Sequence, residues 1–193
     1  MMRGVLIGIL FLMAGAVGWL TFDWYRTTYA GGEAFGAPFT LVDQKGEKIT
    51  EAAFKGSPTA LFFGFTHCPE VCPTTLYELD GWLDQLGEEG EEIEAYFVSI
   101  DPERDTPDVL DRYVANVSDR ITGITGEPRE IAEMAKAFKI YAKKVPLDGG
   151  DYTMDHTASV LLLGRNGDFF GTIAYGENAD TAIAKLRRLA NES

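Results

Sequence analysis

The chain has 193 residues, of which 46% are hydrophobic and 24% are charged. This length fits one globular domain with a short appendage, and the composition excludes an intrinsically disordered chain. The formal net charge is −13, and no dense basic run is present, which argues against a nucleic-acid partner because binding phosphates needs clustered Lys and Arg.

The N-terminal segment is predicted to be a membrane anchor. Residues 5–22 read VLIGILFLMAGAVGWLTF and carry no charge. As a helix they would extend about 27 Å, close to the thickness of the hydrocarbon core of a bilayer. A cleaved signal peptide is the alternative, because Thr28-Tyr29-Ala30 has the form of a cleavage site, but it lies well beyond the end of the apolar stretch.

The predicted organisation is an anchor at residues 1–22, a polar linker at residues 23–36 and a folded domain at residues 37–193. Arg3 and the amino terminus favour an N-terminus on the cytoplasmic side. We therefore expect a single-pass inner-membrane protein whose C-terminal domain faces the periplasm.

The folded domain is predicted to begin with strands. Phe39–Val42 and Glu47–Thr50 flank a polar turn and indicate a hairpin. Thr59–Phe65 is a continuous apolar run, typical of a strand covered on both faces. His67-Cys-Pro-Glu-Val-Cys-Pro73 follows at once. Prolines at positions 69 and 73 disfavour helical geometry at the residues before them, so Cys68 and Cys72 are predicted to lie in a loop.

Helices and strands alternate through the rest of the chain. A helix is predicted from Thr75, which has capping-box spacing to Glu78. The later elements are a strand at Glu94–Ile100, a helix at Asp108–Val117, a strand at Ile121–Thr125, a helix at Pro128–Tyr141, strands at Thr157–Gly164 and Phe169–Tyr175 around an Asn-Gly turn, and a helix at Ala179–Leu189. This order predicts an α/β fold of thioredoxin-like type, with a mixed but mostly parallel central sheet flanked by helices and an inserted segment.

The two cysteines indicate a working site. Cys68 and Cys72 are the only cysteines, too few for a disulfide-stapled fold. They are also too few for a four-ligand zinc site, because the two histidines are far apart in sequence. Between a buried strand and a helix, their sulfurs meet the free N–H groups and the dipole of that helix, which favour the thiolate. Thiol-disulfide oxidoreductases of this fold usually have two residues between the cysteines. Here there are three, Pro69-Glu70-Val71, which leaves both redox chemistry and the binding of a soft ion such as Cu(I) open.

His156 is the predicted third member of this site. It precedes the strand at Thr157, and in a sheet of this type the segment entering that strand faces the cysteine turn. The imidazole could therefore join both sulfurs in a three-ligand set, with Asp155 as a candidate hydrogen-bond partner of the ring. His67 and Met154 are weaker candidates, because His67 is expected to point away from its neighbour Cys68 and a methionine fits a packing role.

Two acidic residues follow the strand at Glu94–Ile100. Asp101 and Asp105 are interpreted as structural residues that cap the helix after Pro107 and pair with Arg104. The glycine-containing stretch Pro146–Tyr152 is expected to move when metal binds.

Three motifs together resemble the Sco/SenC family. They are Gly64-Phe-Thr-His-Cys-Pro-Glu-Val-Cys-Pro73, Ser99-Ile-Asp-Pro-Glu-Arg-Asp-Thr-Pro107 and Asp155-His-Thr157. The resemblance implies a thioredoxin-like domain that binds copper through Cys68, Cys72 and His156, as Cu(I) and with Cu(II) left open. It further implies a role in assembling the dinuclear copper centre of cytochrome c oxidase, with the copper-accepting subunit and other copper chaperones as partners.

Other activities of the cysteine pair stay open at the level of sequence. A thiol-disulfide reductase that keeps partner cysteines reduced would need a reversible disulfide and no histidine ligand. It can coexist with copper binding, because both use the same sulfurs. A peroxide-reducing relative would need one attacking cysteine of low pKa.

Overall fold

The computed structural model describes residue 13, residues 15–22 and residues 35–192. The chain divides into two compact units, Met1–Ala34 and Phe35–Ser193. Residues 15–22 of the first unit are helical, and the rest of the predicted anchor and most of the linker lie outside the described residues. Within the part of the chain that is described, no helix is both long and apolar enough to cross a membrane.

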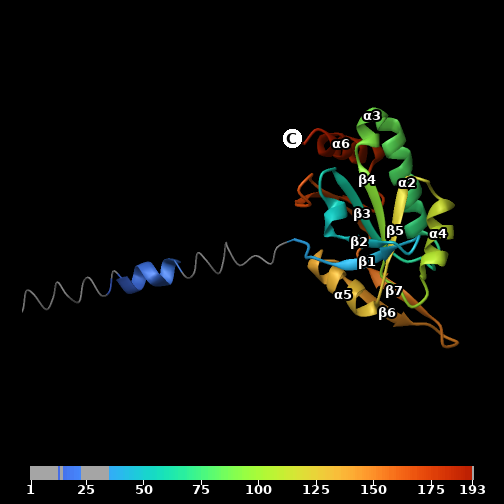
Figure 1. The fold of residues 1–193 in the computed structure, drawn as a ribbon, viewed down its shortest axis with the longest axis horizontal. Helices are drawn as coiled ribbons and strands as arrows, with labels where there is room; N and C mark the ends of the chain where they lie inside the picture. The colour runs from blue at the N-terminus through green and yellow to red at the C-terminus, as the bar shows by residue number, and fades with distance from the viewer. Residues whose placement is uncertain (1–12, 14, 23–34, 193) are drawn as a thin grey trace, which may run out of the picture. The chain divides into compact units, whose positions relative to one another are not determined.

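The second unit is built on a seven-stranded mixed sheet with the strand order β2-β1-β5-β4-β3-β8-β9 (Figure 1). Only the pairs β3–β4 and β4–β5 are parallel, and the other four are antiparallel. The prediction of a mixed sheet is confirmed. The prediction that its strands are mostly parallel is wrong, because hairpins extend the sheet at both edges. The strands are β1 (Thr40–Asp43), β2 (Lys48–Thr50), β3 (Thr59–Gly64), β4 (Glu94–Ser99), β5 (Ile121–Thr125), β8 (Ser159–Leu163) and β9 (Phe169–Ala174).

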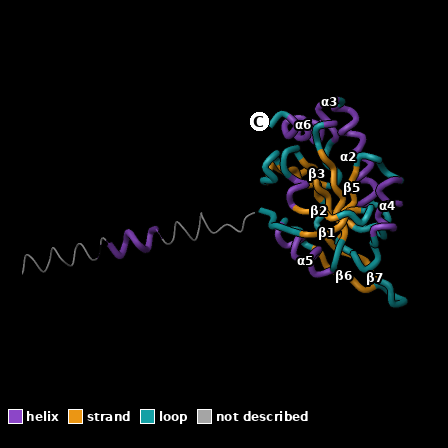
Figure 2. Tube along the Cα trace, viewed as in Figure 1, coloured by secondary structure: helices purple, strands orange, loops and turns teal. Residues whose placement is uncertain are grey.

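Helices cover both faces of this sheet. In Figure 1, α2 and α4 lie on one side and α5 on the other. α2 and α4 connect the parallel strands β3, β4 and β5 in the same direction across the sheet, so right-handed crossovers place both on one face. Figure 2 shows the same layers, with helices around the central strands. The helices are α2 (Val71–Leu86), α3 (Glu88–Glu91), α4 (Pro107–Ala115), α5 (Pro128–Ala137) and α6 (Ala179–Ala190), and a short 3-10 helix, η2, spans Glu51–Phe54.

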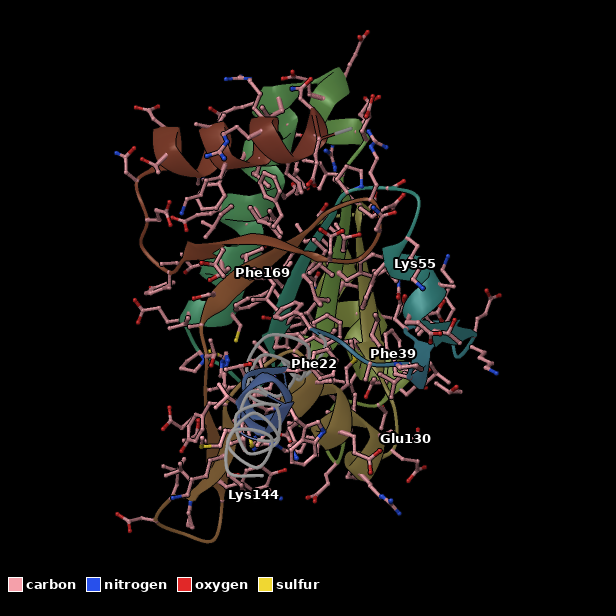
Figure 3. The ribbon with its side chains drawn as sticks, turned by 90° about the vertical axis from the view of Figure 1, so that its left-hand side faces the viewer. Phe22, Phe39, Lys55, Glu130, Lys144 and Phe169 are labelled. Atoms are coloured by element: carbon pink, nitrogen blue, oxygen red, sulfur yellow. The ribbon has the colours of Figure 1, made fainter. Side chains whose placement is uncertain are left out.

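The core lies between the sheet and these helices. Every residue of β3 is buried, which explains its uninterrupted apolar sequence: a strand covered on both faces has no polar side. The largest completely buried side chains of the core are Phe62, Phe63 and Phe97. Figure 3 shows how the side chains fill this space, while the exposed Lys55 and Glu130 project outward.

A separate hairpin projects from the domain. Its strands are β6 (Ala142–Pro146) and β7 (Tyr152–His156), at the lower end of the molecule in Figure 1. The sequence instead indicated a helix running to Tyr141, but α5 ends at Ala137. The chain turns there through Lys139, which has a φ of 58°. A left-handed helix end is normally marked by glycine, and no glycine is present here.

The helix after the cysteine turn begins earlier than predicted. α2 starts at Val71, so Cys72 is helical and Cys68 lies in the loop before it. Pro73 is tolerated because the first turn of a helix has no partners for its N–H groups. Thr75 does not cap the helix, because its hydroxyl donates to the carbonyl of Val71 at 2.8 Å.

Candidate metal centre

The sheet topology brings the cysteine turn and His156 together. β8 runs antiparallel to β3, with Val160 opposite Phe62, so the start of β8 lies at the end of β3. The cysteine turn follows β3 directly, and His156 is the last residue of β7, just before β8. The prediction that the segment entering this strand faces the cysteine turn is confirmed.

The three predicted side chains meet at this junction. Cys72 Sγ lies 3.7 Å from His156 Nε2, across 84 positions of sequence. Cys68 Sγ accepts the backbone N–H of Cys72 at 3.4 Å, in a helix whose N-cap residue, Glu70, gives no side-chain cap. Neither cysteine is in a disulfide. Among the described residues, no group of three or more His, Cys, Asp and Glu side chains is arranged so that it could hold a metal ion.

The two sulfurs differ sharply in ionisation. The pKa of Cys68 is lowered to about 4, mainly by a hydrogen bond from the Cys72 thiol and, in part, by one with His156. The pKa of Cys72 is raised, because its proton is held by Cys68 and because the side chain is buried. The pair therefore shares one proton at neutral pH, with the partly exposed Cys68 as the thiolate.

The imidazole is held with one nitrogen directed at the sulfurs. Nδ1 of His156 lies 2.9 Å from the carbonyl oxygen of Thr157. A carbonyl only accepts, so Nδ1 carries a proton, and Nε2 is the ring nitrogen directed toward Cys72. The rings of Phe62 and Phe65 flank the imidazole at centroid distances of 6.3 Å and 5.8 Å. The prediction that Asp155 is the hydrogen-bond partner of the ring is wrong. Asp155 is exposed, and the backbone carbonyl of Thr157 takes this role.

Gly64 is a site residue that the sequence reasoning missed. A Cβ at this position would lie 2.8 Å from Cys72 Sγ and 2.7 Å from the ring of Phe97, both closer than real contacts allow. Glycine is thus required for Cys72 to pack against the end of β3. The available signal was a single glycine inside an apolar strand, which often marks a close approach of another group.

The weaker candidates take other roles. The side chain of His67 is 53% exposed, and its Nδ1 lies 3.9 Å from Asp105 Oδ1 and 3.2 Å from Thr66 Oγ1. Met154 packs against the hydrophobic core, as its interpretation as a packing residue predicts.

The two aspartates are structural, but not as caps. Asp101 pairs with Arg104 as predicted. The N-cap of α4 is Thr106, and no side chain caps it, so the predicted capping role is wrong. Asp105 instead accepts hydrogen bonds from Thr66 and Ser99.

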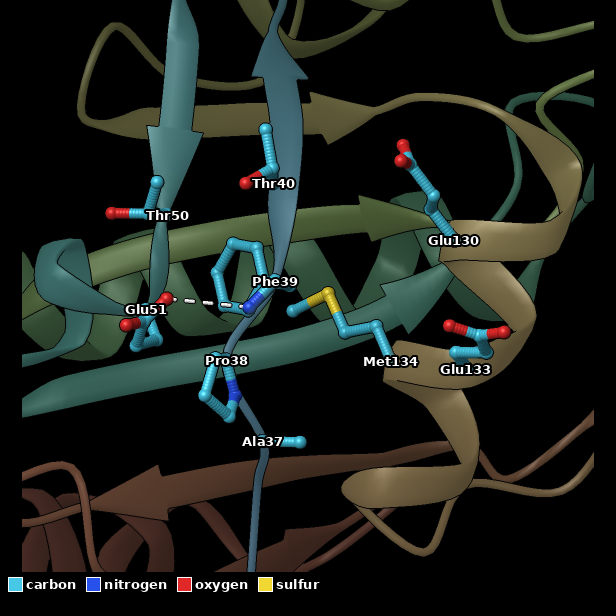
Figure 4. Close-up of a pocket in the computed structure, with 9 residues that line it drawn as sticks. All are labelled: Ala37, Pro38, Phe39, Thr40, Thr50, Glu51, Glu130, Glu133 and Met134. Atoms are coloured by element: carbon cyan, nitrogen blue, oxygen red, sulfur yellow. Dashed lines mark hydrogen bonds between the residues drawn. The ribbon is translucent and has the colours of Figure 1, made fainter.

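A hollow elsewhere on the domain is separate from this centre. It lies between β1, β2 and α5, and Figure 4 shows Glu51 accepting the Phe39 N–H while Glu130 and Glu133 project from α5. None of Cys68, Cys72 and His156 lines it.

A mixed sheet with a cysteine turn between a central strand and a helix, faced by a histidine, defines a thioredoxin-like protein equipped for metal or redox chemistry. The SCO1/SenC family model matches residues 27–191. The chain belongs to this family.

Named relatives agree with this assignment. "Protein SCO1 homolog 1, mitochondrial" of Arabidopsis thaliana is 37% identical over 152 residues, covering 78% of this chain and 45% of the relative. The structure of Bradyrhizobium japonicum ScoI with copper bound is 44% identical, with a TM-score of 0.75, and the match covers 81% of this chain and 99% of that one. The chain spans about half the length of the first curated relatives it matches.

A second solved structure concerns the cysteine chemistry of a relative. It is described as identifying a disulfide switch in BsSco, a member of the Sco family of cytochrome c oxidase assembly proteins. It is 28% identical to this chain, with a TM-score of 0.67, and the match covers 83% of this chain and 95% of that one.

Proposed function

We propose that this chain is a copper chaperone that holds copper through Cys68, Cys72 and His156 and delivers it during assembly of the dinuclear copper centre of cytochrome c oxidase. The copper bound in the Bradyrhizobium relative supports copper as the ion that is carried. The description of the Sco family as cytochrome c oxidase assembly proteins supports cytochrome c oxidase as the enzyme that receives the copper.

The observation that carries the proposal is the 3.7 Å separation of Cys72 Sγ and His156 Nε2. An ion about 2.3 Å from a sulfur and about 2.0 Å from an imidazole nitrogen, as zinc is, keeps the two ligands about 3.5–3.7 Å apart at tetrahedral or trigonal angles. Two of the proposed ligands thus have suitable spacing for one ion, and Cys68, which contacts Cys72 and His156, would complete the set.

The donor chemistry favours copper and its transfer. Soft thiolates select Cu(I), and a site with only three protein ligands leaves the ion open to an incoming ligand from an acceptor. Cys68 is already a thiolate at neutral pH, so binding requires only the proton of Cys72 to leave. Acidification should therefore weaken binding, because protons compete with copper for the sulfurs.

A variant series tests the ligand set. Copper affinity should be lost in Cys68→Ala and Cys72→Ala proteins and should fall at least about tenfold in His156→Ala protein, because even residues that only orient a metal ligand are worth this much. The chain contains two histidines, which makes His67→Ala a matched control expected to bind like the parent. Equal affinities of the two histidine variants, measured by competition with a Cu(I) chelator, would contradict the assignment.

A second function, thiol-disulfide exchange, is favoured by the unequal cysteines. Exchange needs an accessible thiolate and a second thiol to resolve the mixed disulfide, and Cys68 and Cys72 meet this description. Reduction of a disulfide substrate that persists in His156→Ala protein and is lost in Cys68→Ala protein would support this activity. Its absence in the copper-free parent would exclude it.

We also propose an inner-membrane location, with the domain of residues 37–193 facing the periplasm. The uncharged run at residues 5–22 supports an anchor. The full chain should remain in the membrane fraction after a high-salt wash, and protease should reach its domain only from the periplasmic side. Recovery of the full chain in the soluble fraction would refute the anchor.

A further inference from the structure

The segment Asp101–Asp105, between β4 and α4, contacts both segments that carry the candidate ligands, at Thr66 and at Tyr152. It contributes to the family resemblance in sequence, yet it supplies none of the proposed ligands. Two backbone hydrogen bonds fold it into a compact turn, from the N–H groups of Arg104 and Asp105 to the carbonyl of Asp101 at 3.1 Å and 2.9 Å. Its first and last side chains point to different parts of the site.

Asp105 fixes the start of the cysteine turn. Its side chain is completely buried, and Oδ2 accepts the backbone N–H of Thr66 at 3.0 Å and the Ser99 hydroxyl at 2.6 Å. Oδ1 accepts the Thr66 hydroxyl at 2.6 Å. Hydrogen bonds to a charged acceptor are the strong ones, and a buried carboxylate is tolerated only when it is bonded in this way. Thr66 stands two positions before Cys68, so the entry to the turn is fixed to the sheet.

Asp101 fixes the hairpin that carries His156. Its buried carboxylate accepts the hydroxyl of Tyr152 at 2.8 Å and also pairs with Arg104. Arg104 then donates to the carbonyl oxygen of Tyr152 at 3.0 Å. Tyr152 is the first residue of β7, and His156 is the last.

Two cations contact the ring of the same tyrosine. The guanidinium of Arg104 lies 3.8 Å from the centre of the Tyr152 ring, and Lys144 Nζ lies 3.9 Å from it. Lys144 also pairs with Glu103 at 2.7 Å. Figure 3 shows Lys144 on the projecting hairpin. The ring is thus held by cation–π contacts as well as by its hydroxyl.

We propose that Asp101–Asp105 is the positioning element of the copper site: it sets the separation between the sulfur pair and the imidazole by holding Thr66 with one end and Tyr152 with the other. This inference rests on the proposed function, because it assumes that all three side chains bind one ion. Asp101, Asp105 and Tyr152 act as positioning residues and do not touch the metal.

A double-mutant cycle tests whether Tyr152 positions His156. Tyr152→Phe removes one hydroxyl and keeps the ring, and it should weaken Cu(I) binding of the full chain roughly three- to tenfold, the value of one hydrogen bond. The same change in a His156→Ala background should have no effect, because the hydroxyl acts through the imidazole. Tyr77→Phe is the matched control, since the Tyr77 hydroxyl also donates one 2.8 Å bond, to the carbonyl of Asn116, and it should bind copper like the parent.

For the contact between Asp105 and the start of the cysteine turn, we expect the opposite pattern. Asp105→Asn should weaken Cu(I) binding at least roughly threefold in both the parent and the His156→Ala background, because it acts through the sulfurs. Urea unfolding checks that each variant is folded. If Asp105→Asn does not fold, Thr66→Val tests the same contact with a smaller loss.

A spectroscopic readout separates positioning from a general loss of stability. Nitrogen hyperfine coupling in the paramagnetic resonance spectrum of the Cu(II)-loaded chain should weaken in Tyr152→Phe protein and stay unchanged in Tyr77→Phe protein. An equal effect of Tyr152→Phe in the presence and absence of His156, or no effect in either, would overturn the positioning role. Parent protein whose copper binding does not depend on His156 would instead overturn the proposed function itself, and the positioning role with it.

Discussion

The two sulfurs of the cysteine turn are unlike each other because the fold treats them differently. Cys72 is helical and buried, whereas Cys68 lies in the loop and takes the free N–H of the helix start. The sequence predicts a thiolate at such a junction. It does not predict which cysteine is helical, because a proline follows each of them. The partner of the imidazole was beyond sequence reasoning, since it is the carbonyl of Thr157 and every residue has a carbonyl.

The pH dependence of alkylation tests the ionisation of Cys68. An ordinary cysteine thiol has a pKa of about 8.5, whereas the pKa of Cys68 is about 4. Cys68 therefore stays a reactive thiolate as the pH falls and is protonated only near its own pKa. The alkylation rate of the copper-free chain should therefore be nearly flat from about pH 8 to about pH 5. Cys72→Ala removes the largest cause of the shift and should move the profile to higher pH. A parent profile centred near the ordinary value would contradict the proton-sharing pair.

At the scale of elements, the strands and helices that carry apolar patterns could be predicted, and the projecting hairpin could not. β3 and the β8–β9 hairpin follow from a buried apolar run and an Asn-Gly turn. The β6–β7 pair is exposed along most of β6, so burial leaves no alternating pattern in its sequence. Movement of its connecting stretch on metal binding stays a prediction.

The close approach of β3 to the helix can be tested at Gly64. Gly64→Ala should lower the free energy of unfolding by about 1–3 kcal/mol, because an added methyl group in a packed core forces its neighbours apart. It should also weaken copper binding, because one of those neighbours is Cys72 Sγ.

Gly81→Ala is the matched control for that substitution. Gly81 lies within α2, and a Cβ there meets nothing within 4 Å. Alanine in a helix interior should leave stability unchanged or raise it by about 0.5–1 kcal/mol. Urea unfolding of both variants gives the comparison, and equal free energies of unfolding would show that Gly64 is not constrained by packing.

For the whole molecule, the thioredoxin-like class could be predicted from the order of elements, whereas the balance of parallel and antiparallel pairs could not. Short edge strands such as β2 (Lys48–Thr50) carry little pattern of their own, yet they decide how the sheet ends. The convergence of the site is a property of topology: His156 meets the cysteines because β8 runs back along β3.

X-ray absorption at the copper edge of the loaded chain tests the central claim most directly, because it counts the ligand types around the ion. We expect two sulfur ligands and one imidazole nitrogen per copper, with the nitrogen lost in His156→Ala protein and kept in His67→Ala protein. A copper environment of sulfur alone in the parent, or one unchanged by His156→Ala, would contradict it.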